Sequence, residues 1–234
     1  MERKKYLVII PARGGSKRLK NKNLLFLANK PLIAHSIEVA NSIPSVDKII
    51  VSTDSEDILK ASLQYGAECP FMRPNSLATD TSTTFDVIKH ALSTLETEHN
   101  ITFENVILLQ PTSPLRTKEN LIDAIELFEA KKANALISIC ECEHSPLWTN
   151  TLSEEKSMNS FLDSQVLNKR SQDLPTYYRL NGAIYIYKTE ELLKNKSMFP
   201  TEKSFGFVMD PINSIDIDNQ LDFDFAEFMM LKNN

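Results

Sequence analysis

The chain has 234 residues and a formal net charge of -5, with 42% hydrophobic and 24% charged residues. These proportions are ordinary for a globular domain and argue against disorder. The acidic balance excludes a broad attraction to nucleic acid or to an anionic membrane surface, so neither is an expected partner. An anion that binds to this chain must therefore be held by a local cluster of donors.

The amino terminus and the cysteines bear on the compartment. The apolar stretch behind the basic start breaks at Pro11 and Arg13, and no apolar run approaches the roughly 20 residues of a membrane helix. Three cysteines are too few, and odd in number, for a secreted disulfide framework. Cys140 and Cys142 lack the second pair that a zinc site needs. We expect a cytoplasmic protein.

Predicted strands and helices alternate along the chain. Short apolar or β-branched runs predict strands at 7–11, 48–53, 105–110, 135–140 and 183–187. Amphipathic runs bounded by caps or prolines predict helices at 31–43, 55–66, 83–95, 118–132 and 220–231. A late strand end is expected at 214–218. Strands that alternate with long helices form βαβ units, which predicts an α/β fold with a parallel sheet and right-handed crossovers.

The length and the rhythm of the pattern predict one domain over 1–234, because a chain of this size buries one sizeable core. The rhythm is lost between about residues 144 and 178, where periodicity is weak and polar residues are frequent. We interpret 144–178 as an excursion from the sheet and not as a second domain.

The loop after the first strand, 11–23, is the leading candidate for a binding site, because ligands of open α/β sheets lie outside the carboxyl ends of strands. It holds two of the five glycines and five cations. Glycines let backbone amides approach an anion, and the cations neutralise a polyphosphate. The loop has neither the Walker A spacing nor the dinucleotide glycine pattern. Its charge favours polyphosphate binding over a merely solvated surface.

The same loop carries a family resemblance that extends over nearly the whole chain. Its sequence IPARGGSKR, followed by Lys22-Asn23, resembles the signature of the acylneuraminate cytidylyltransferases, the CMP-sialic acid synthetase family with its legionaminic-acid-type members. Four further blocks resemble the family in the same order: 73–81, 109–116, 178–185 and 214–218. The resemblance implies a Rossmann-like fold of the nucleotidyltransferase type, with a mostly parallel sheet, helices on both faces and a small dimerisation excursion.

The resemblance also implies CTP as co-substrate and Mg²⁺ as cofactor. The residues expected to hold the triphosphate, base and ribose are Arg13, Ser16, Lys17, Lys22, Asn23, Arg73, Asp80, Thr81 and Thr83. Lysine contributes a point charge and arginine a forked contact, while a residue that opens a helix adds backbone amides at its positive end. A surface salt bridge is the alternative for Arg73.

Asp216 and Asp218 are the implied magnesium ligands. Two residues apart on an extended segment, their side chains point to the same side, which suits two carboxylates that share one cation. An isolated Asp-x-Asp is common at strand ends and helix caps, so the assignment depends on the other blocks. Asp222 and Asp224 fit the first turns of the last helix.

The acceptor side follows from the resemblance alone, and its candidates are Gln110, Arg170, Arg179, Asn181, Tyr185 and Phe199. A guanidinium matches the carboxylate of a sugar acid with two parallel hydrogen bonds. Arg116 follows two prolines, and a role in bracing its loop is as consistent with the sequence as a role in binding.

The implied reaction joins CMP from CTP to a nine-carbon 2-keto sugar acid of the N-acylneuraminate or legionaminate type. The anomeric hydroxyl attacks the α-phosphorus and pyrophosphate leaves in line, with Arg13, Lys22, Asp216 and Asp218 as the catalytic residues. No general base is assigned, because His35, His90, His99 and His144 lie outside the matching blocks.

Two alternatives remain at this point. Enzymes of the eight-carbon lipopolysaccharide sugar acid carry Lys-Pro where this chain has Lys22-Asn23, which argues against that substrate. A catalytically silent nucleotide-binding module is disfavoured by the intact cations and aspartates. Family enzymes dimerise through an arm in the region of 144–178, so we expect a homodimer in which Trp148, Phe161 and Leu167 anchor the contact, or else cover this chain's own core.

Overall fold

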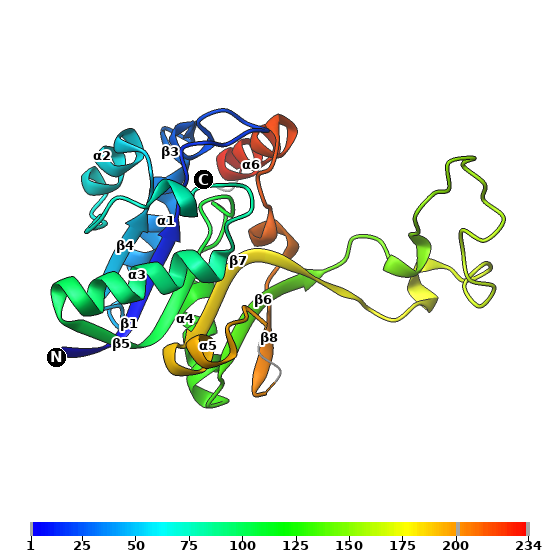
Figure 1. The fold of residues 1–234 in the computed structure, drawn as a ribbon. Coiled ribbons are helices and arrows are strands. Elements are labelled where there is room, and N and C mark those ends of the chain that lie inside the picture. The colour runs from blue at the N-terminus through cyan, green and yellow to red at the C-terminus, as the bar shows by residue number, and fades with distance from the viewer. Residues whose placement is uncertain (1, 200–201, 233–234) are drawn as a thin grey trace.

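The computed structural model describes residues 2–199 and 202–232, and a six-stranded sheet lies at its centre (Figure 1). The order across the sheet is β4-β1-β5-β7-β6-β8. The strands are β1 (Glu2–Pro11), β4 (Lys48–Ser52), β5 (Ile101–Leu109), β6 (Ala135–Glu141), β7 (Tyr178–Lys188) and β8 (Ser204–Val208). Strand β7 runs antiparallel to both neighbours, whereas the other pairs are parallel. The predicted mostly parallel sheet is confirmed.

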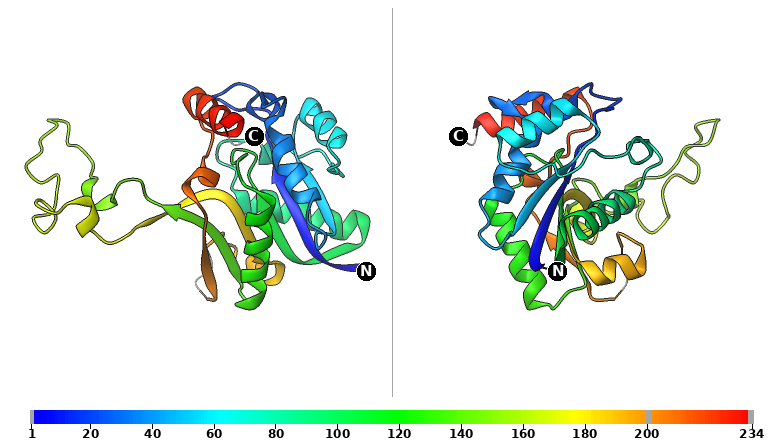
Figure 2. Two further views of the ribbon diagram at one scale, coloured as in Figure 1. Left: turned by 180° about the vertical axis from the view of Figure 1, so that it is seen from behind. Right: turned by 60° about the vertical axis from the view of Figure 1, so that its left-hand side comes forward.

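Helices cover both faces of the sheet, as the two further views show (Figure 2). One face carries α1 (Leu32–Asn41), α2 (Glu56–Gln64) and α4 (Lys118–Ala130), and the other carries α3 (Thr84–His99) and α5 (Thr189–Asn195). This arrangement follows from the strand sequences. Tyr6, Val8 and Ile10 of β1 enter one core, and Leu7 and Ile9 between them enter the other. A strand with apolar residues on both sides must be covered on both sides.

A third, smaller core lies near the carboxyl edge of the parallel strands. It joins α6 (Gln220–Lys232) to the two-stranded β2 (Phe26–Leu27) and β3 (Lys30–Pro31) and to the chain that follows β5. Its buried members are Leu27, Leu32, Leu115, Ile217, Phe223 and Ala226. This core fixes the ends of three loops against one another.

An arm leaves the body between β6 and β7 and projects away from the sheet (Figure 1). It contains two short 3-10 helices, η3 (Pro146–Trp148) and η4 (Ser171–Asp173), and it is closed at its base by the hydrogen bond from Cys142 N to Tyr177 O, 2.8 Å. Of its described residues, Val166 is buried and the others are exposed or half-buried. Trp148, Phe161 and Leu167 belong to none of the three cores.

One predicted element is wrong, and others went unpredicted. The segment 214–218 is not a strand: it begins at the end of η5 (Pro211–Ser214) and continues as irregular chain. Its central amide, Ile217 N, donates to Thr112 O at 2.8 Å, so the segment binds a loop instead of the sheet ladder. The sequence analysis also missed α5 and β8. The five other predicted strands are present: β1, β5 and β7 begin four or five residues earlier than predicted, and the remaining bounds agree within one residue.

Among residues 2–199 and 202–232, no helix combines the length and the apolar character needed to cross a bilayer.

The amino terminus of α4 gives a stability prediction. Thr117 Oγ1 accepts from Asn120 N at 3.1 Å, and Asn120 Oδ1 accepts from Thr117 N at 3.1 Å, which forms a capping box. We expect Thr117→Ala to lower the free energy of unfolding by about 1 kcal/mol, because the box loses its hydroxyl acceptor. Urea denaturation measures the change. Thr97→Ala is the control, since this exposed hydroxyl in α3 bonds Ser93 O and caps nothing. Equal losses in the two variants would contradict the assignment.

Candidate active site

The principal cavity opens where the topology of the sheet reverses. From β1 the chain crosses one face through α1 to reach β4, and then crosses the opposite face through α3 to reach β5 on the other side of β1. The chain after β1 leads to β4 and the chain after β5 leads to β6, on opposite sides in the strand order, so the two loops diverge, and ligands of α/β sheets bind at such a point. A cavity of about 600 Å³ lies there, lined by both loops.

The basic loop, residues 11–23, forms one wall. Arg13, Lys17, Arg18 and Lys22 all line the cavity. Two hydrogen bonds between backbone and side-chain groups fix this loop: Gly14 N donates to Asp54 Oδ1 at 2.9 Å, and the side chain of the buried Asn23 donates to Arg13 O at 3.1 Å. These contacts keep cations together that would otherwise separate by mutual repulsion.

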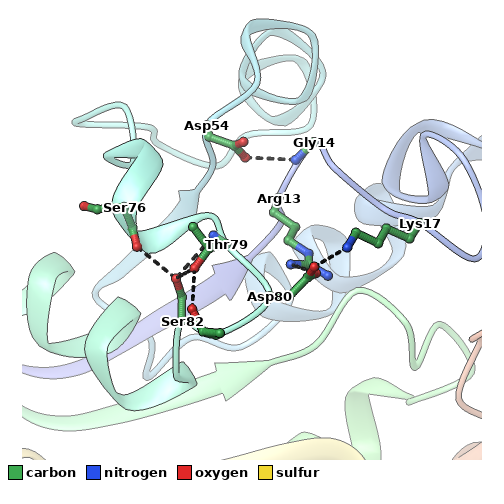
Figure 3. A network of polar contacts seen from close by, with 9 residues as sticks. Arg13, Gly14, Lys17, Asp54, Ser76, Thr79, Asp80 and Ser82 are labelled. Atoms are coloured by element: carbon green, nitrogen blue, oxygen red, sulfur yellow. Dashed lines mark hydrogen bonds and ion pairs between the residues drawn. The ribbon is translucent and has the colours of Figure 1, made fainter.

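A turn between α2 and α3 brings a carboxylate onto these cations (Figure 3). Asp80 contacts Arg13 at 2.9 Å and also pairs with Lys17. The turn is shaped by its own hydroxyls, since Ser82 Oγ donates to Ser76 O at 3.0 Å and lies 2.8 Å from Thr79 Oγ1. Hydrogen bonds from Lys17 and then Arg13 lower the pKa of the Asp80 carboxyl, so it is ionised and occupies two cations of the loop.

The opposite wall carries Asp218, one of the two predicted metal ligands, whereas Asp216 is not among the residues that line the cavity. Asp218 lines the cavity and lies 2.8 Å from Arg18 and 3.6 Å from Lys22. Desolvation raises the pKa of Asp216, the charge of nearby Asp218 raises it further, and a hydrogen bond with Thr112 opposes the change. Ile217 between them is buried in the third core. The alternation of apolar and acidic residues thus places both carboxylates on the outer side, although no strand is formed.

The floor of the cavity is the chain that follows β5. Gln110, Pro111 and Thr112 line it. Gly182 in β7 makes room for the Gln110 side chain: its φ is +75°, and a Cβ there would lie 2.9 Å from Gln110 Oε1. A residue with a side chain at 182 would therefore push the Gln110 amide from its place.

A second cavity of about 290 Å³ shares Pro11, Arg13 and Asp80 with the first and continues toward Arg73. The Arg73 guanidinium is buried, and its Nε donates to Ser52 Oγ at 3.1 Å. The surface salt bridge considered for Arg73 is therefore not what the structure contains. Burial lowers the pKa of Arg73, and the carboxylate of Asp54 opposes that change.

The structure places one set of the predicted site residues around the principal cavity and places others away from it. The principal cavity is lined by Arg13, Ser16, Lys17, Lys22, Asn23, Asp80, Gln110 and Asp218. Thr83 caps α3 by accepting from Asp86 N, and Thr81 lies in the turn beside Asp80. Neither of them lines the two cavities described above.

The acceptor candidates are mostly outside the cavity of their own chain. Arg170 lies in the arm and binds Asp173 at 2.9 Å, Arg179 lies 3.8 Å from Glu143, and the Phe199 side chain is exposed. Tyr185 is buried next to Tyr187, near enough to Asp216 for its charge to raise the tyrosine pKa, which burial already raises. Asn181 is buried under the cavity wall and bonded to protein groups.

Two lining residues had no role in the sequence analysis. Arg18 was one of five cations in the loop, and the charge of the loop alone could not show that it reaches Asp218. Thr112 stood in a matching block directly after a strand, which is the signal that would have singled it out. Arg116, left open between bracing and binding, is buried and braces: it donates to Ala183 O at 2.6 Å and to Ser36 Oγ at 2.6 Å.

The two aspartates fit a magnesium ion whose remaining ligands come from elsewhere. Among the described residues no group of three or more His, Cys, Asp and Glu side chains gathers around one point. Mg²⁺ is usually held by one or two carboxylates together with substrate phosphates and water. Asp216 and Asp218, of which Asp218 faces the basic loop, are such a partial ligand set.

A basic loop after the first strand, at the switch point of a mostly parallel sheet, places the molecule among the nucleotide-binding α/β proteins. The chain belongs to the cytidylyltransferase family, whose model matches residues 7–232.

Curated relatives extend across the chain. It is 38% identical over 234 residues to N-acylneuraminate cytidylyltransferase of Escherichia coli O18:K1:H7, covering 99% of this chain and 54% of the relative. The chain thus spans about half the length of that relative. It is 36% identical to CMP-N,N'-diacetyllegionaminic acid synthase of Legionella pneumophila, covering 96% and 95%. It is 35% identical to pseudaminic acid cytidylyltransferase of Campylobacter jejuni, covering 98% of each.

Solved structures share the fold at lower identity. CMP:2-keto-3-deoxy-manno-octonic acid synthetase complexed with CTP aligns with a TM-score of 0.71 and 18% identity, covering 98% of this chain and 100% of that one. 4-Diphosphocytidyl-2C-methyl-D-erythritol synthase from Anaerococcus prevotii aligns with a TM-score of 0.66 and 15% identity, covering 97% and 99%. The predicted nucleotidyltransferase-type fold is confirmed.

The Asp80 contact gives a prediction that needs no substrate. We expect the Asp80 carboxyl to titrate below the ordinary aspartate range, because Lys17 and Arg13 favour its charged form. The contact is then present at neutral pH and is lost as the pH falls through this lowered pKa. Lys17→Ala should raise the pKa toward the ordinary value, as followed by carboxyl ¹³C NMR across a pH series.

Lys20→Ala is the matched control for that titration. Lys20 is exposed in the same loop and makes no ion pair within the described part of the chain. An ordinary pKa for Asp80 in the unaltered protein would show that the contact does not persist in solution.

Proposed function

We propose that this protein transfers CMP from CTP to a nine-carbon 2-keto sugar acid of the sialic or legionaminic type and releases pyrophosphate. The observation that carries the proposal is the cavity at the switch point, where Arg13, Lys17, Arg18 and Lys22 line the same space as Asp218, two residues after Asp216. The relatives support the acceptor class, because they are named for three nonulosonic acids.

The charges in the cavity suit a magnesium nucleotide. Four cations stand against Asp80 and Asp218, which leaves an excess of two positive charges on the lining. CTP with one Mg²⁺ carries about two negative charges at neutral pH, so the two sets balance. Lys22 is the least exposed of the four cations, and its ammonium donates to Ile217 O at 2.6 Å. It would hold a phosphate oxygen near the aspartates.

The chemistry proposed for the site is positioning and charge stabilisation. A bound Mg²⁺ would supply a Lewis acid at the phosphates and would be held by Asp216 and Asp218. Arg13 and Lys22 would bind the equatorial oxygens of the reacting phosphate, and their attraction grows as charge shifts toward the leaving pyrophosphate. Ser16, Lys17 and Asn23 would fix the rest of the nucleotide from the same loop, and Arg73 with Asp80, Thr81 and Thr83 would lie toward the base and ribose.

A histidine general base finds no support in the geometry. All four histidines lie in the described ranges, and none lines the principal cavity. His35 is buried, and desolvation lowers its pKa to about 4, so it is neutral at physiological pH. We propose that binding in the correct geometry supplies most of the acceleration.

The acceptor would lie over Gln110 and Thr112, beside Tyr185. Gln110 presents an amide to an N-acyl group of the acid, and Gly182 keeps the space for that amide. Arg170, Arg179 and Phe199 would act from outside this wall. Because Arg170 belongs to the projecting arm, we propose that it serves the cavity of a partner subunit in a homodimer.

The remaining readings are weaker. The eight-carbon acid occurs in the name of a structural neighbour that is 18% identical to this chain. A likeness at that identity supports the fold alone. A silent module would not need a basic loop that faces a carboxylate such as Asp218. Three free cysteines and an acidic surface accord with a cytoplasmic location, which we propose as the compartment.

Pyrophosphate release from CTP tests the reaction. We expect release that requires Mg²⁺ and stops on addition of a chelator, with one of N-acetylneuraminic, legionaminic or pseudaminic acid as acceptor. Asp216→Asn should lower kcat/KM about 100-fold or more, because it removes a charged ligand from the reacting centre. Asp224→Asn is the matched control, since that exposed carboxylate bonds Gln220 within α6. Silence with all three acids, in folded protein that binds CTP, would contradict the acceptor class.

Light scattering tests the dimer. We expect the mass of two chains at micromolar concentration, and the mass of one for Leu167→Asp, because a charge would be buried where the arms meet. The Leu167 side chain is 58% exposed in the single chain, so its replacement should leave the fold intact. Leu63→Asp on α2, where the leucine is 53% exposed, is the control and should stay dimeric. A mass of one chain for the unaltered protein would refute the dimer.

A further inference from the structure

We propose that Asn181 is a positioning residue that holds the aspartate-bearing segment, residues 210–218, against the sheet through Ser214. The inference rests on the proposed function, in which Asp216 and Asp218 bind the metal of the nucleotide. It assigns Asn181 a role different from the sugar contact that the family resemblance implied.

Asn181 lies at an irregularity in the sheet. The pairing of β6 with β7 shifts register between Ile137 and Ile139, and Ser138 stands at the shift. There the Ser138 hydroxyl accepts from Ile184 N at 2.7 Å and so replaces a missing ladder partner. Its proton is then free to be donated to Asn181 Oδ1, at 2.5 Å. The irregularity therefore presents a fixed hydroxyl to the asparagine.

The orientation of the Asn181 amide is determined by its neighbours. Its oxygen accepts from Ser138 Oγ and, at 3.2 Å, from Ala183 N. A backbone N–H can only donate, so the atom that faces Ala183 N must be the amide oxygen. Its nitrogen therefore points the other way, donates to Ser214 Oγ at 2.9 Å and contacts Met209 Sδ at 3.4 Å. Ser214 in turn donates to Asp210 O at 2.8 Å. A directed chain of hydrogen bonds thus runs from β7 to the segment that carries the aspartates.

The burial of these hydrogen-bonded residues distinguishes a positioning role for Asn181 from a ligand-binding role. Asn181 is 2% exposed, and Ser138 and Ser214 are fully buried. Both lone pairs of the amide oxygen and both amide protons already have partners, so nothing is left for a ligand. Ser214 precedes Asp216 by two residues, and Asp210 opens η5. A shift of Ser214 would be transmitted to Asp216 through one intervening residue.

The segment has few other attachments to the sheet. Because it is not a strand, it lacks ladder bonds, and its described backbone contacts at the two ends are Met209 N to Ile139 O at 2.8 Å and Ile217 N to Thr112 O at 2.8 Å. Between these points the side chains of Asn181 and Ser214 make the connection. Groups that orient metal ligands from behind govern metal affinity, and their loss typically costs about tenfold or more.

The test compares two fully buried serines, of which one bonds Asn181 and the other lies outside this network. Ser214→Ala breaks the connection from Asn181 to the aspartate-bearing segment, whereas Ser62→Ala removes a hydroxyl that donates to Ile58 O at 2.7 Å within α2. Calorimetry gives the Kd of CTP with chelator and again with Mg²⁺, and the ratio of the two values is the tightening due to the metal. We expect Ser214→Ala to reduce this ratio about tenfold, with the metal-free Kd unchanged, and Ser62→Ala to preserve both values.

Two further variants keep the result decisive. Ser214→Cys retains a weak donor and acceptor of similar size and should give an intermediate ratio, which also serves if Ser214→Ala fails to fold. Asp216→Asn should abolish the tightening. If Asp216→Asn retains it, the metal assignment in the proposed function is wrong. If Asp216→Asn loses it but Ser214→Ala and Ser214→Cys match Ser62→Ala, the metal assignment stands and the positioning role is overturned.

Discussion

The site depends on the burial of Ile217 between two aspartates. This side chain enters a small core with Leu27, Leu115 and Phe223, which belong to the segment after the basic loop, the chain after β5 and the last helix. Burial of one large aliphatic side chain contributes roughly 1.5–3 kcal/mol, enough to offset mutual repulsion among partly solvated charges at the surface. The apolar contact thus brings the cations of one loop against the carboxylates of another segment, and Lys22 completes it by bonding the Ile217 carbonyl.

Topology decides where that contact forms. Residues 67–69 run alongside β4, with Val51 N bonded to Glu68 O at 2.8 Å, and carry the chain to the carboxyl edge before it crosses to α3. The turn with Asp80 therefore lies at the same edge as the basic loop. Strand β7 returns from the arm antiparallel to its neighbours, which brings its first residues to this edge as well. Segments from four parts of the chain meet there because of strand direction alone.

Local patterns were sufficient to predict five of the six strands, most helices and the basic wall of the cavity. The cations of the basic loop are contiguous in sequence, so their grouping needed no tertiary knowledge. The acceptor side was not predictable in this way. Whether Asn181 faces a ligand or the interior is set by a register shift between two strands, and the burial of Arg73 is set by its contact with Ser52. From the sequence alone, such polar residues are predicted to lie at the surface, because their hydrogen-bond partners are distant in the sequence. The prediction of a strand at 214–218 was wrong for the same kind of reason, because the amide at the centre of this segment donates to a loop carbonyl and not to a neighbouring strand.

The ion pairs of Asp80 show how the cavity accommodates like charges without a ligand. Arg13 and Lys17 share this carboxylate, which is exposed and lies on a turn held by its own hydroxyls (Figure 3). Exposed ion pairs are weak, so the arrangement is easily exchanged for a stronger anion. Under the proposed function, a triphosphate would offer several charged oxygens to the same two cations and would gain forked contacts that one carboxylate cannot give. Asp80 would then be released to the rim of the cavity, and it would pair with the two cations again when the polyanion leaves.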